Sequence, residues 1–296
     1  MADALVPFVF EDAAVRGAIV RLDDTVRAAL APHRYPPPLA RALSELAAAT
    51  TLLAASLKGR GSLTAQLSAS GPARLAVVEC NHALDVRATA QWDEAACSAL
   101  PADATLALLA GDPARARFAI TVDPGDGTIA QGIVALEPAS VATMLAHYLE
   151  RSAQVASRLV LASDAGRVGG LLVQKLPDAR SDDPRGWTGI AERVESLRAA
   201  DLVGVADPVG AIARAFSDRD VRVYAARTPR YACRCSAARA ARTLANAGRD
   251  EVEAAIAETG RVDVTCEFCG KRYTYTPDQA RALFNAGAPA GAGSRR

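Results

Sequence analysis

Two pairs of cysteines near the C-terminus constrain this chain more than any other feature. Four of its six cysteines form the segments Cys233-Arg-Cys235 and Cys266-Glu-Phe-Cys269, which are thirty residues apart. Zinc takes four tetrahedral thiolate or imidazole ligands, with sulfur at about 2.3 Å. The three histidines all lie far upstream of these segments, so an all-cysteine site is the natural ligand set. We therefore predict one zinc ion per chain, held by these four cysteines.

The spacing of the two pairs carries further information. The segment Cys266-Glu-Phe-Cys269-Gly270 has the form of a zinc knuckle, in which a tight turn directs two thiolates at one ion. A Cys-x-Cys pair on extended backbone places both side chains on one face, and it can also close a small strained disulfide. Thiolates are the form of cysteine that peroxide attacks. The spacing indicates a redox switch, while a purely architectural zinc site remains an alternative.

Length and composition narrow the class of protein. The 296 residues predict about two domains, and 50% apolar with 23% charged residues is typical of a folded globular chain. A net charge of +1 argues against a dedicated nucleic-acid binder. The N-terminus has no basic region typical of a signal peptide, and the uncharged stretch Leu46–Leu57 is too short to span a bilayer. We expect a cytoplasmic protein without a membrane segment or nucleic-acid partner.

Residues 1–177 are predicted to form a mixed α/β domain. Three consecutive prolines at positions 36–38 open a helix, and no charge falls between Glu45 and Lys58, so this helix should be buried on most sides. A second helix is expected over residues 138–151. Strand patterns occur at Phe8–Phe10, Arg16–Leu22, Leu63–Ala69, Leu75–Val78, Val86–Trp92, Phe118–Val122, Ile129–Leu136, Leu159–Leu161 and Val168–Leu176.

The remaining chain is predicted to contain a linker, a small domain and a tail. Residues 178–229 hold eight basic and nine acidic residues, with helical patterns near 190–200 and 208–217, and should form a metastable helical linker. Residues 230–285 should form the zinc module, with helices at 236–247, 249–258 and 277–284 and strands at 262–265 and 272–275. Residues 286–296 should be a disordered tail. The predicted fold class is therefore α+β.

Several segments resemble one known family. The cysteine segments read Tyr231-Ala-Cys-Arg-Cys-Ser236 and Val264-Thr-Cys-Glu-Phe-Cys-Gly-Lys-Arg-Tyr273. The sequence closely resembles the 33 kDa chaperonin family (heat shock protein 33), from about Phe8 to Phe284. Ala153 departs from the acidic residue that we expect there. The upstream segments that share the resemblance are His33–Pro36, Leu43–Lys58, Gln131–Leu136, Tyr148–Gln154 and Gly169–Gln174.

The resemblance implies a redox-regulated, ATP-independent holdase chaperone. In such a protein the reduced, zinc-loaded form is largely inactive and monomeric. Oxidants with heat join Cys233 to Cys235 and Cys266 to Cys269, zinc leaves, the module and linker lose structure, and the chain becomes a homodimer that binds unfolding clients. The linker's apolar residues are then the candidate client-binding residues: Trp187, Ile190, Val194, Leu197, Leu202 and Phe216.

Other functional classes fit the residues less well. A zinc-ribbon nucleic-acid binder is disfavoured, because residues 230–286 contain nine basic and seven acidic residues without a basic stripe. A thiol–disulfide oxidoreductase needs a Cys-x-x-Cys that opens a helix, whereas this pair lies between two predicted strands. We recognise no phosphate-binding glycine loop, nucleophile elbow or acid/base pair, so no enzyme is predicted. Cys80 and Cys97 are expected to be buried or incidental thiols without a role in switching.

Overall fold

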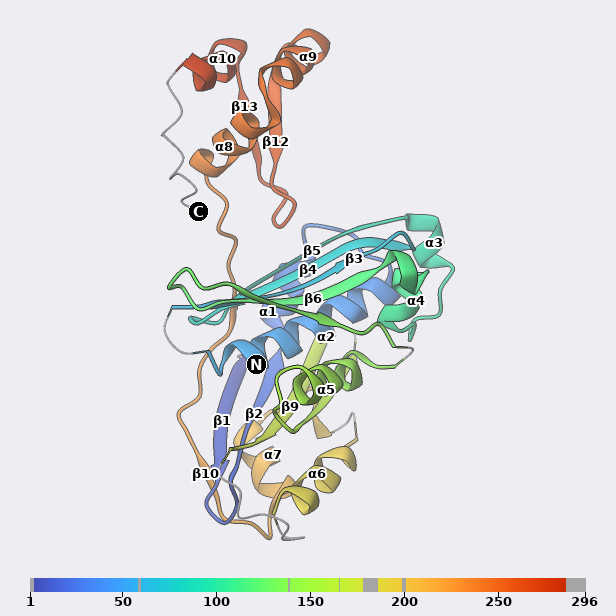
Figure 1. Cartoon of the computed structure of the whole chain (residues 1–296), viewed down its shortest axis with the longest axis vertical. Helices are drawn as coiled ribbons and strands as arrows, with labels where there is room; N and C mark the ends of the chain where they lie inside the picture. The colour runs from blue at the N-terminus through green and yellow to red at the C-terminus, as the bar shows by residue number, and fades with distance from the viewer. Residues whose placement is uncertain are drawn as a thin grey trace. The chain divides into compact units, whose positions relative to one another are not determined.

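The structure, a computed structural model, describes residues 3–57, 60–137, 139–164, 166–177, 186–198 and 201–285. The chain divides into two compact units, Met1–Ala232 and Cys233–Arg296 (Figure 1). The predicted tail and residues 178–185 of the predicted linker lie outside the described residues. The predicted α+β class is confirmed, and the residue bounds of the predicted linker stay a prediction.

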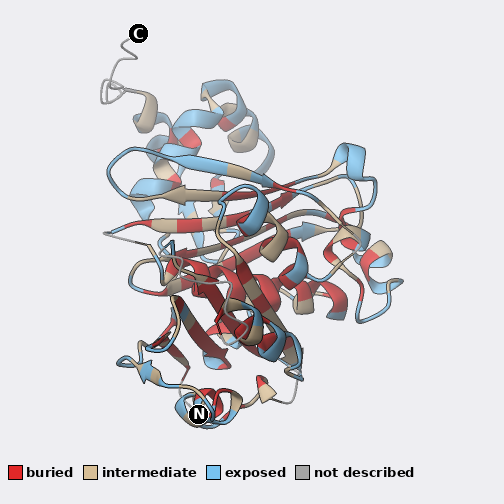
Figure 2. Cartoon of the chain, turned by 60° about the horizontal axis from the view of Figure 1, so that its bottom comes forward, coloured by how far each residue is buried: buried red, intermediate tan, exposed pale blue. Residues whose placement is uncertain are grey.

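A buried helix is the centre of the first unit. Helix α2 (Pro37–Ala54) begins with two prolines, which its first turn tolerates because those N–H groups have no helical partner. Nearly all residues from Leu39 onward are buried, as the absence of charge predicted. The helix packs on strands of two different sheets and so lies between them (Figures 1 and 2). It ends at Ala54, within the uncharged run that precedes Lys58.

One sheet lies below α2 in the view of Figure 1. Its neighbouring strands all pair antiparallel. Side chains of one parity contact α2, and those of the other parity point to the opposite face, as strand geometry requires. In order across the described sheet, the strands are β10 (Val221–Val223), β1 (Ala4–Phe10), β2 (Val15–Leu22), β9 (Arg167–Lys175) and β8 (Ser157–Asp164).

A second sheet covers the other side of α2. A hairpin turn follows Asp123, with Gly125 and Gly127 at φ 83° and 93°. The Asp123 and Asp126 carboxylates accept hydrogen bonds from the backbone N–H of Gly125 and Thr128. In order across the described sheet, the strands are β11 (Arg230–Tyr231), β5 (Asp85–Trp92), β4 (Ala73–Asn81), β3 (Ser62–Ser68), β6 (Arg117–Asp123) and β7 (Ala130–Val134).

Short elements were the ones that the sequence patterns missed. Helix α1 (Asp24–Leu30) is capped from a distance, because the Asp3 carboxylate accepts hydrogen bonds from the backbone N–H of residues 23, 24 and 25. Helices α3 (Glu94–Ser98) and α4 (Leu106–Ala110) have local caps but span little more than one turn. The predicted second helix is α5 (Val141–Arg151), which starts later than predicted because Ser140 caps it.

The helices in the described part of the predicted linker pack on the face of the first sheet that points away from α2, and its residues Val221–Val223 form the edge strand β10 of that sheet. Helix α6 (Trp187–Glu195) starts three residues before its predicted start, and helix α7 (Pro208–Ala215) starts where predicted. The α6 helix ends at Glu195, earlier than predicted, and the Leu197 N–H already donates to the Val194 carbonyl, three residues back. Together with the sheet these helices form a second hydrophobic cluster, separate from the one around α2.

The second unit is small and lightly packed. Its elements match the predicted ones: α8 (Ala237–Ala247), α9 (Arg249–Thr259), β12 (Val262–Thr265), β13 (Arg272–Tyr275) and α10 (Pro277–Asn285). Gly260 ends α9 in the left-handed conformation that favours glycine. Among its described residues, the buried hydrophobic side chains are Ala240, Leu244, Val252, Val262 and Ala280.

Candidate metal centre

Two short segments of the second unit carry the four cysteines. Cys233 and Cys235 lie in the extended segment just before α8, whose first turn is capped by Ser236 accepting a hydrogen bond from the backbone N–H of Arg239. Cys266 and Cys269 lie in the turn that joins β12 to β13. All four side chains are half-buried, so each thiol is within reach of solvent.

The turn between β12 and β13 is built as the sequence predicted. The backbone N–H groups of Cys269 and Gly270 both donate to the Cys266 carbonyl, at 3.3 and 2.8 Å, and the Cys266 N–H donates to the Lys271 carbonyl at 2.9 Å. Gly270 has φ 68°, a conformation that costs most other residues free energy. The turn therefore brings two thiols close together and requires a glycine where the sequence has one.

The four sulfur atoms form one compact group. All lie within 4.8 Å of one another, with 3.6 Å between the Sγ atoms of Cys233 and Cys266 and 3.5 Å between those of Cys235 and Cys269. A regular tetrahedron of sulfurs at about 2.3 Å from a zinc ion has edges of about 3.8 Å. The arrangement therefore fits a tetrahedral metal ion, and the four predicted ligands are brought together.

Hydrogen bonding and burial make the four thiols unequal. The Tyr273 hydroxyl donates to the Cys235 Sγ at 3.1 Å, which lowers the pKa of Cys235 to about 7 and raises that of Tyr273 to about 12. Burial raises the pKa of Cys269 to about 12 and also raises the pKa of Cys233. A coordinated divalent cation holds all its thiol ligands as thiolates. Cys235 is thus the thiol best prepared for ligation or oxidation.

The two remaining cysteines lie elsewhere. Cys80 in β4 and Cys97 in α3 are buried in the core around α2, as predicted. Burial raises the pKa of Cys97, and the nearby carboxylates of Asp93 and Glu94 raise it further. Among the described residues, neither cysteine belongs to a cluster of candidate metal ligands.

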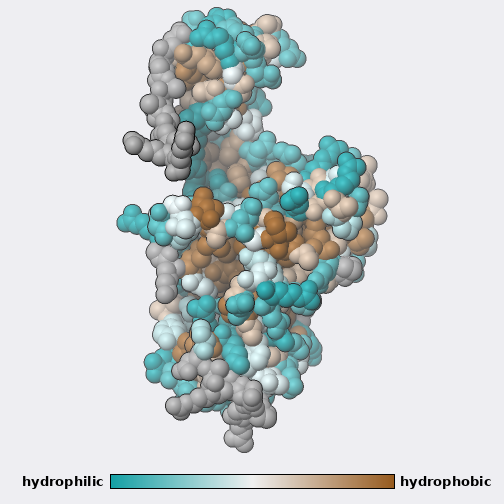
Figure 3. Space-filling model, viewed as in Figure 1, coloured by the Kyte–Doolittle hydropathy of each residue, from teal (hydrophilic) through white to brown (hydrophobic). Residues whose placement is uncertain are grey.

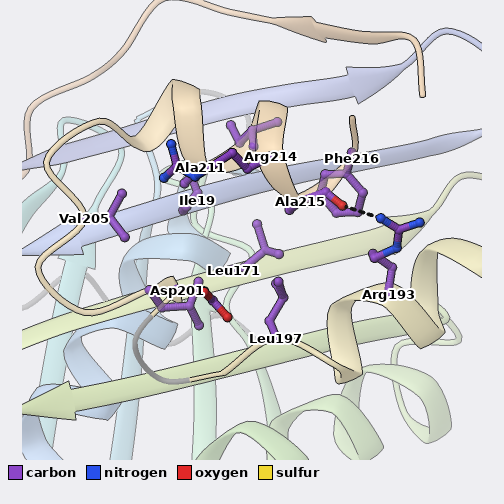
Figure 4. A pocket seen from close by; sticks show the side chains of 12 residues that line it. Ile19, Leu171, Arg193, Leu197, Asp201, Val205, Ala211, Arg214, Ala215 and Phe216 are labelled. Atoms are coloured by element: carbon purple, nitrogen blue, oxygen red, sulfur yellow. Dashed lines mark hydrogen bonds between the residues drawn. The ribbon is translucent and has the colours of Figure 1, made fainter. Parts of the chain in front are cut away.

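The predicted client-binding residues are covered in this structure. Four of them, Ile190, Val194, Leu202 and Phe216, are buried, and Trp187 and Leu197 are partly buried. They pack against one face of the first sheet, and α6 and α7 border a cavity of about 320 Å³ above that face (Figure 4). The apolar sheet residues beneath them, which the sequence did not single out, are Val6, Phe8, Phe10, Ile19, Leu171 and Val173.

Two further residues hold the linker layer, which consists of residues 186–198 and 201–216, to the sheet. The sequence analysis did not identify either role. The buried Arg21 of β2 donates to the Val205 carbonyl at 2.5 Å and to the Ala206 carbonyl at 3.3 Å. Gly169 of β9 lies so close to the linker that an added Cβ would be 2.2 Å from the Leu202 carbonyl oxygen. The available signals were a charge within the apolar strand β2 and a glycine pair within β9.

No described helix combines the length and apolarity needed to cross a lipid bilayer.

Comparison with known proteins gives one consistent result. The family model of the Hsp33 protein matches residues 3–276. A 33 kDa chaperonin of Methylobacillus flagellatus is 37% identical over 287 residues, which cover 96% of this chain and 95% of that protein. One of Chromobacterium violaceum is 38% identical over 292 residues, covering 96% and 94%. A crystal structure of a 33 kDa chaperonin homologue from Thermotoga maritima shares the fold, with TM-score 0.77 over 95% of this chain and 98% of that one at 21% identity. On these matches the chain belongs to the Hsp33 family.

Proposed function

We propose that this chain is a redox-regulated, ATP-independent holdase that binds unfolding proteins under oxidative stress. The observation that carries the proposal is the compact group of four thiols in a unit with almost no hydrophobic core. The chaperone name of its relatives supports the client class. We place the protein in the cytoplasm, where thiols stay reduced until an oxidant arrives.

One zinc ion per chain is the proposed cofactor of the reduced form. Four sulfur ligands in a tetrahedral arrangement favour zinc or an iron–sulfur cluster. Thiolate ligation would hold Cys233, Cys235, Cys266 and Cys269 together and supply folding free energy, which in zinc-finger peptides amounts to about 10–16 kcal/mol. The four cysteines thereby couple the order of the second unit to their own redox state.

Oxidation is proposed to join Cys233 to Cys235 and Cys266 to Cys269, as the family resemblance implies. In each pair one thiol reduces a peroxide to water and becomes a sulfenic acid, and the second thiol displaces a second water to form the disulfide. Each disulfide takes two electrons from the sulfurs and delivers them to one peroxide. Four thiols and two peroxides thus give two disulfides and four waters, and no thiolate is left to ligate a metal.

Loss of order in the second unit is proposed to spread to the linker. Residues 178–229 would then leave the sheet face under mild heat, because their helices depend on packing against it. The exposed linker residues Trp187, Ile190, Val194, Leu197, Leu202 and Phe216 would bind unfolding clients, and the activated chain would form a homodimer. The step needs no nucleotide, since the energy source is oxidation.

The proposal is tested by comparing reduced, zinc-loaded protein with protein treated with peroxide at mildly elevated temperature. We expect only the treated form to suppress light scattering by a denatured client protein, with zinc released to a chromophoric chelator. Peptide mapping without reductant should show the 233–235 and 266–269 disulfides, and sedimentation should show a dimer.

Several outcomes would contradict the proposal. Equal suppression by the reduced and treated forms would exclude redox regulation. Disulfides that join 233 to 266 and 235 to 269, the pairs with the shortest Sγ separations, would overturn the assigned pairing. If a Cys80→Ala/Cys97→Ala variant folds but is no longer activated by peroxide, the switch depends on Cys80 or Cys97, and the proposed assignment to the other four cysteines is wrong. Catalytic turnover of disulfides in a substrate protein would favour an oxidoreductase, and tight nucleic-acid binding would favour the zinc-ribbon alternative.

A further inference from the structure

A small cavity lies between the C-terminal end of α2 and the first sheet. It has a volume of about 160 Å³ and is bordered by residues of α2, β1, β2 and β9 and by Tyr224, which follows β10. It shares no lining residue with the cavity under α6 and α7. The hydrophobic surface on the face that carries β6 in Figure 1 (Figure 3) belongs to the second sheet. The cavity is therefore a separate feature of the first sheet.

The walls of this cavity are mainly apolar. Pro7 of β1 is paired with Ala18 of β2, which is paired with Leu172 of β9, so these three side chains lie on the same face of the sheet. Leu52 and Ala55 border the cavity from the helix. An engineered apolar cavity of about 150 Å³ binds benzene. The volume here therefore fits one apolar group of about the size of a benzene ring.

One arginine lines the cavity and is held in place without an acidic partner. Arg16 is the one charged residue among the described residues of the lining, and it forms no ion pair with any of the described chain. Its Nε and Nη2 both donate to the Oε1 of Gln174, at 3.3 and 3.0 Å. Gln174 is buried and is itself fixed, because its Nε2 donates to the Ser157 Oγ at 3.2 Å. The guanidinium is thus positioned by a neutral partner and keeps its full charge.

The remaining edge of this guanidinium is suited to a carboxylate. Gln174 occupies the edge that carries Nε, and Nη1 of Arg16 has no hydrogen-bond partner in the described parts of the chain. Arginine favours carboxylates that accept two parallel hydrogen bonds. The C-terminal end of α2 carries about half a negative charge, which the whole positive charge of Arg16 exceeds. Tyr224, which is 47% exposed, adds a hydroxyl at the same cavity.

We propose that this cavity binds a small organic acid. Its carboxylate pairs with Arg16, and its apolar group, of about the size of a benzene ring, fills the space between α2 and the sheet. A guanidinium is permanently charged, so an anion is favoured over a neutral or cationic molecule. The apolar walls favour an acid with a ring or a branched chain over a small hydrophilic anion. The inference goes beyond the proposed holdase function and does not depend on it.

The test measures the binding of benzoate to the reduced full-length chain by isothermal titration calorimetry. We expect a Kd of about 0.5 mM, which is an ordinary affinity for a ligand of this size. Benzyl alcohol lacks the charge and acetate lacks the ring, so each should bind about tenfold more weakly or not at all. Hydrogen exchange of residues 221–224 should slow about twofold with benzoate, because Tyr224 lines the cavity.

Two pairs of variants locate the binding. Arg16→Gln removes the charge and should weaken benzoate binding about twentyfold. Arg222→Gln is its matched control, because Arg222 lies in the same sheet, pairs with Glu11 at 2.7 Å and does not line the cavity. Ala55→Leu should prevent binding by filling the cavity, whereas Ala55→Ser adds a single atom and should retain it. Thermal unfolding checks that each variant is folded.

Each outcome decides the inference. Equal benzoate binding by the wild type and a folded Arg16→Gln variant, or no saturable binding below about 10 mM, would overturn it. Equal binding of benzyl alcohol and benzoate would overturn the acidic ligand class. Tighter binding of N-acetylphenylalanine than of benzoate would support the site and identify the C-terminal residue of a peptide, rather than a free acid, as the source of the carboxylate. No client or oxidant is present, so failure here leaves the proposed function untouched.

Discussion

The two units of this chain are held together by different means. The first unit surrounds α2 with a continuous set of buried side chains from two sheets, and a second apolar cluster lies under α6 and α7. The second unit has five buried hydrophobic side chains among its described residues, and two of them are alanines, Ala240 and Ala280. Small domains with so little core usually need metals or disulfides for stability.

The difference assigns separate sources of stability to separate parts of one chain. Apolar burial is insensitive to oxidants, whereas a thiolate ligand set is lost when its sulfurs are oxidised. In the proposed function, an oxidant would therefore remove the order of the second unit without attacking the core around α2. The linker layer is intermediate in its source of stability. It is held by apolar contacts, but only by those that it makes with one face of the sheet.

Replacing a ligand is the strongest test of this comparison. Cys266→Ser should abolish stoichiometric zinc binding, because serine is a poor zinc ligand and three thiolates remain. The second unit should then lose most of the folding free energy that the metal supplies, on the order of 10 kcal/mol in model peptides. Elemental analysis and region-by-region hydrogen exchange measure both effects.

The matched control is Cys97→Ala, which alters a buried thiol of the first unit. This variant should retain zinc and full protection of residues 233–285. Full zinc retention by Cys266→Ser, or fast exchange in strands β3 and β6 of that variant, would show that the two units are not stabilised separately.

Gly169→Ala should release the linker layer while leaving the metal site intact. The new methyl group would overlap the Leu202 carbonyl, and the backbone on both sides would have to move, at a cost of about 3 kcal/mol. We expect faster exchange in 187–216 and partial client holding without oxidant, at unchanged zinc content. Light scattering of a denatured client under reducing conditions is the measurement.

Gly166→Ala is the control for that variant. Gly166 lies in the turn between β8 and β9, where an added Cβ would meet nothing within 4 Å, although its φ of 83° imposes backbone strain. It should destabilise the hairpin slightly without activating the chain. Comparable activation by both variants would mean that strain in β9, rather than contact with Leu202, controls the linker.

Arg21→Met should have a smaller effect of the same kind. Methionine keeps the apolar stem but removes the charged donors to the Val205 and Ala206 carbonyls, which costs about 2 kcal/mol for a buried charged hydrogen bond. The oxidant concentration needed for half-maximal client holding should fall. An unchanged oxidation threshold together with unchanged exchange in 201–216 would show that Arg21 does not hold the linker.

Tyr273→Phe should have the smallest effect. It removes the hydroxyl that donates to Cys235, a partner of the type whose loss costs about tenfold in metal affinity or more. Tyr275→Phe is the matched control, because the Tyr275 hydroxyl donates to the Ala237 carbonyl at the same 3.1 Å and not to sulfur. Competition with a chelator at neutral pH should show weaker zinc binding only for Tyr273→Phe.

Local patterns predicted much of this structure, and contacts between distant residues account for what they missed. The uncharged run after Glu45 predicted that α2 is buried, and the cysteine spacing predicted the four-sulfur group. Helix α1 escaped prediction because its capping carboxylate belongs to Asp3, outside the local window. The docking roles of Arg21 and Gly169 were hidden for the same reason, since their partners lie more than thirty residues further along the chain.

Both faces of the first sheet are apolar, and this determines how much apolar surface the proposed activation would expose. Strand alternation gives β1, β2 and β9 one row of side chains for α2 and another for the linker. If the linker leaves the sheet as proposed, its own apolar residues become exposed to solvent. The sheet residues beneath it, including Phe8, Phe10 and Leu171, become exposed at the same time. Each lost contact would thus expose two apolar surfaces, one on the released linker and one on the sheet. In the proposed function, a client would then bind to a mobile segment and to a fixed sheet face of the same molecule at once.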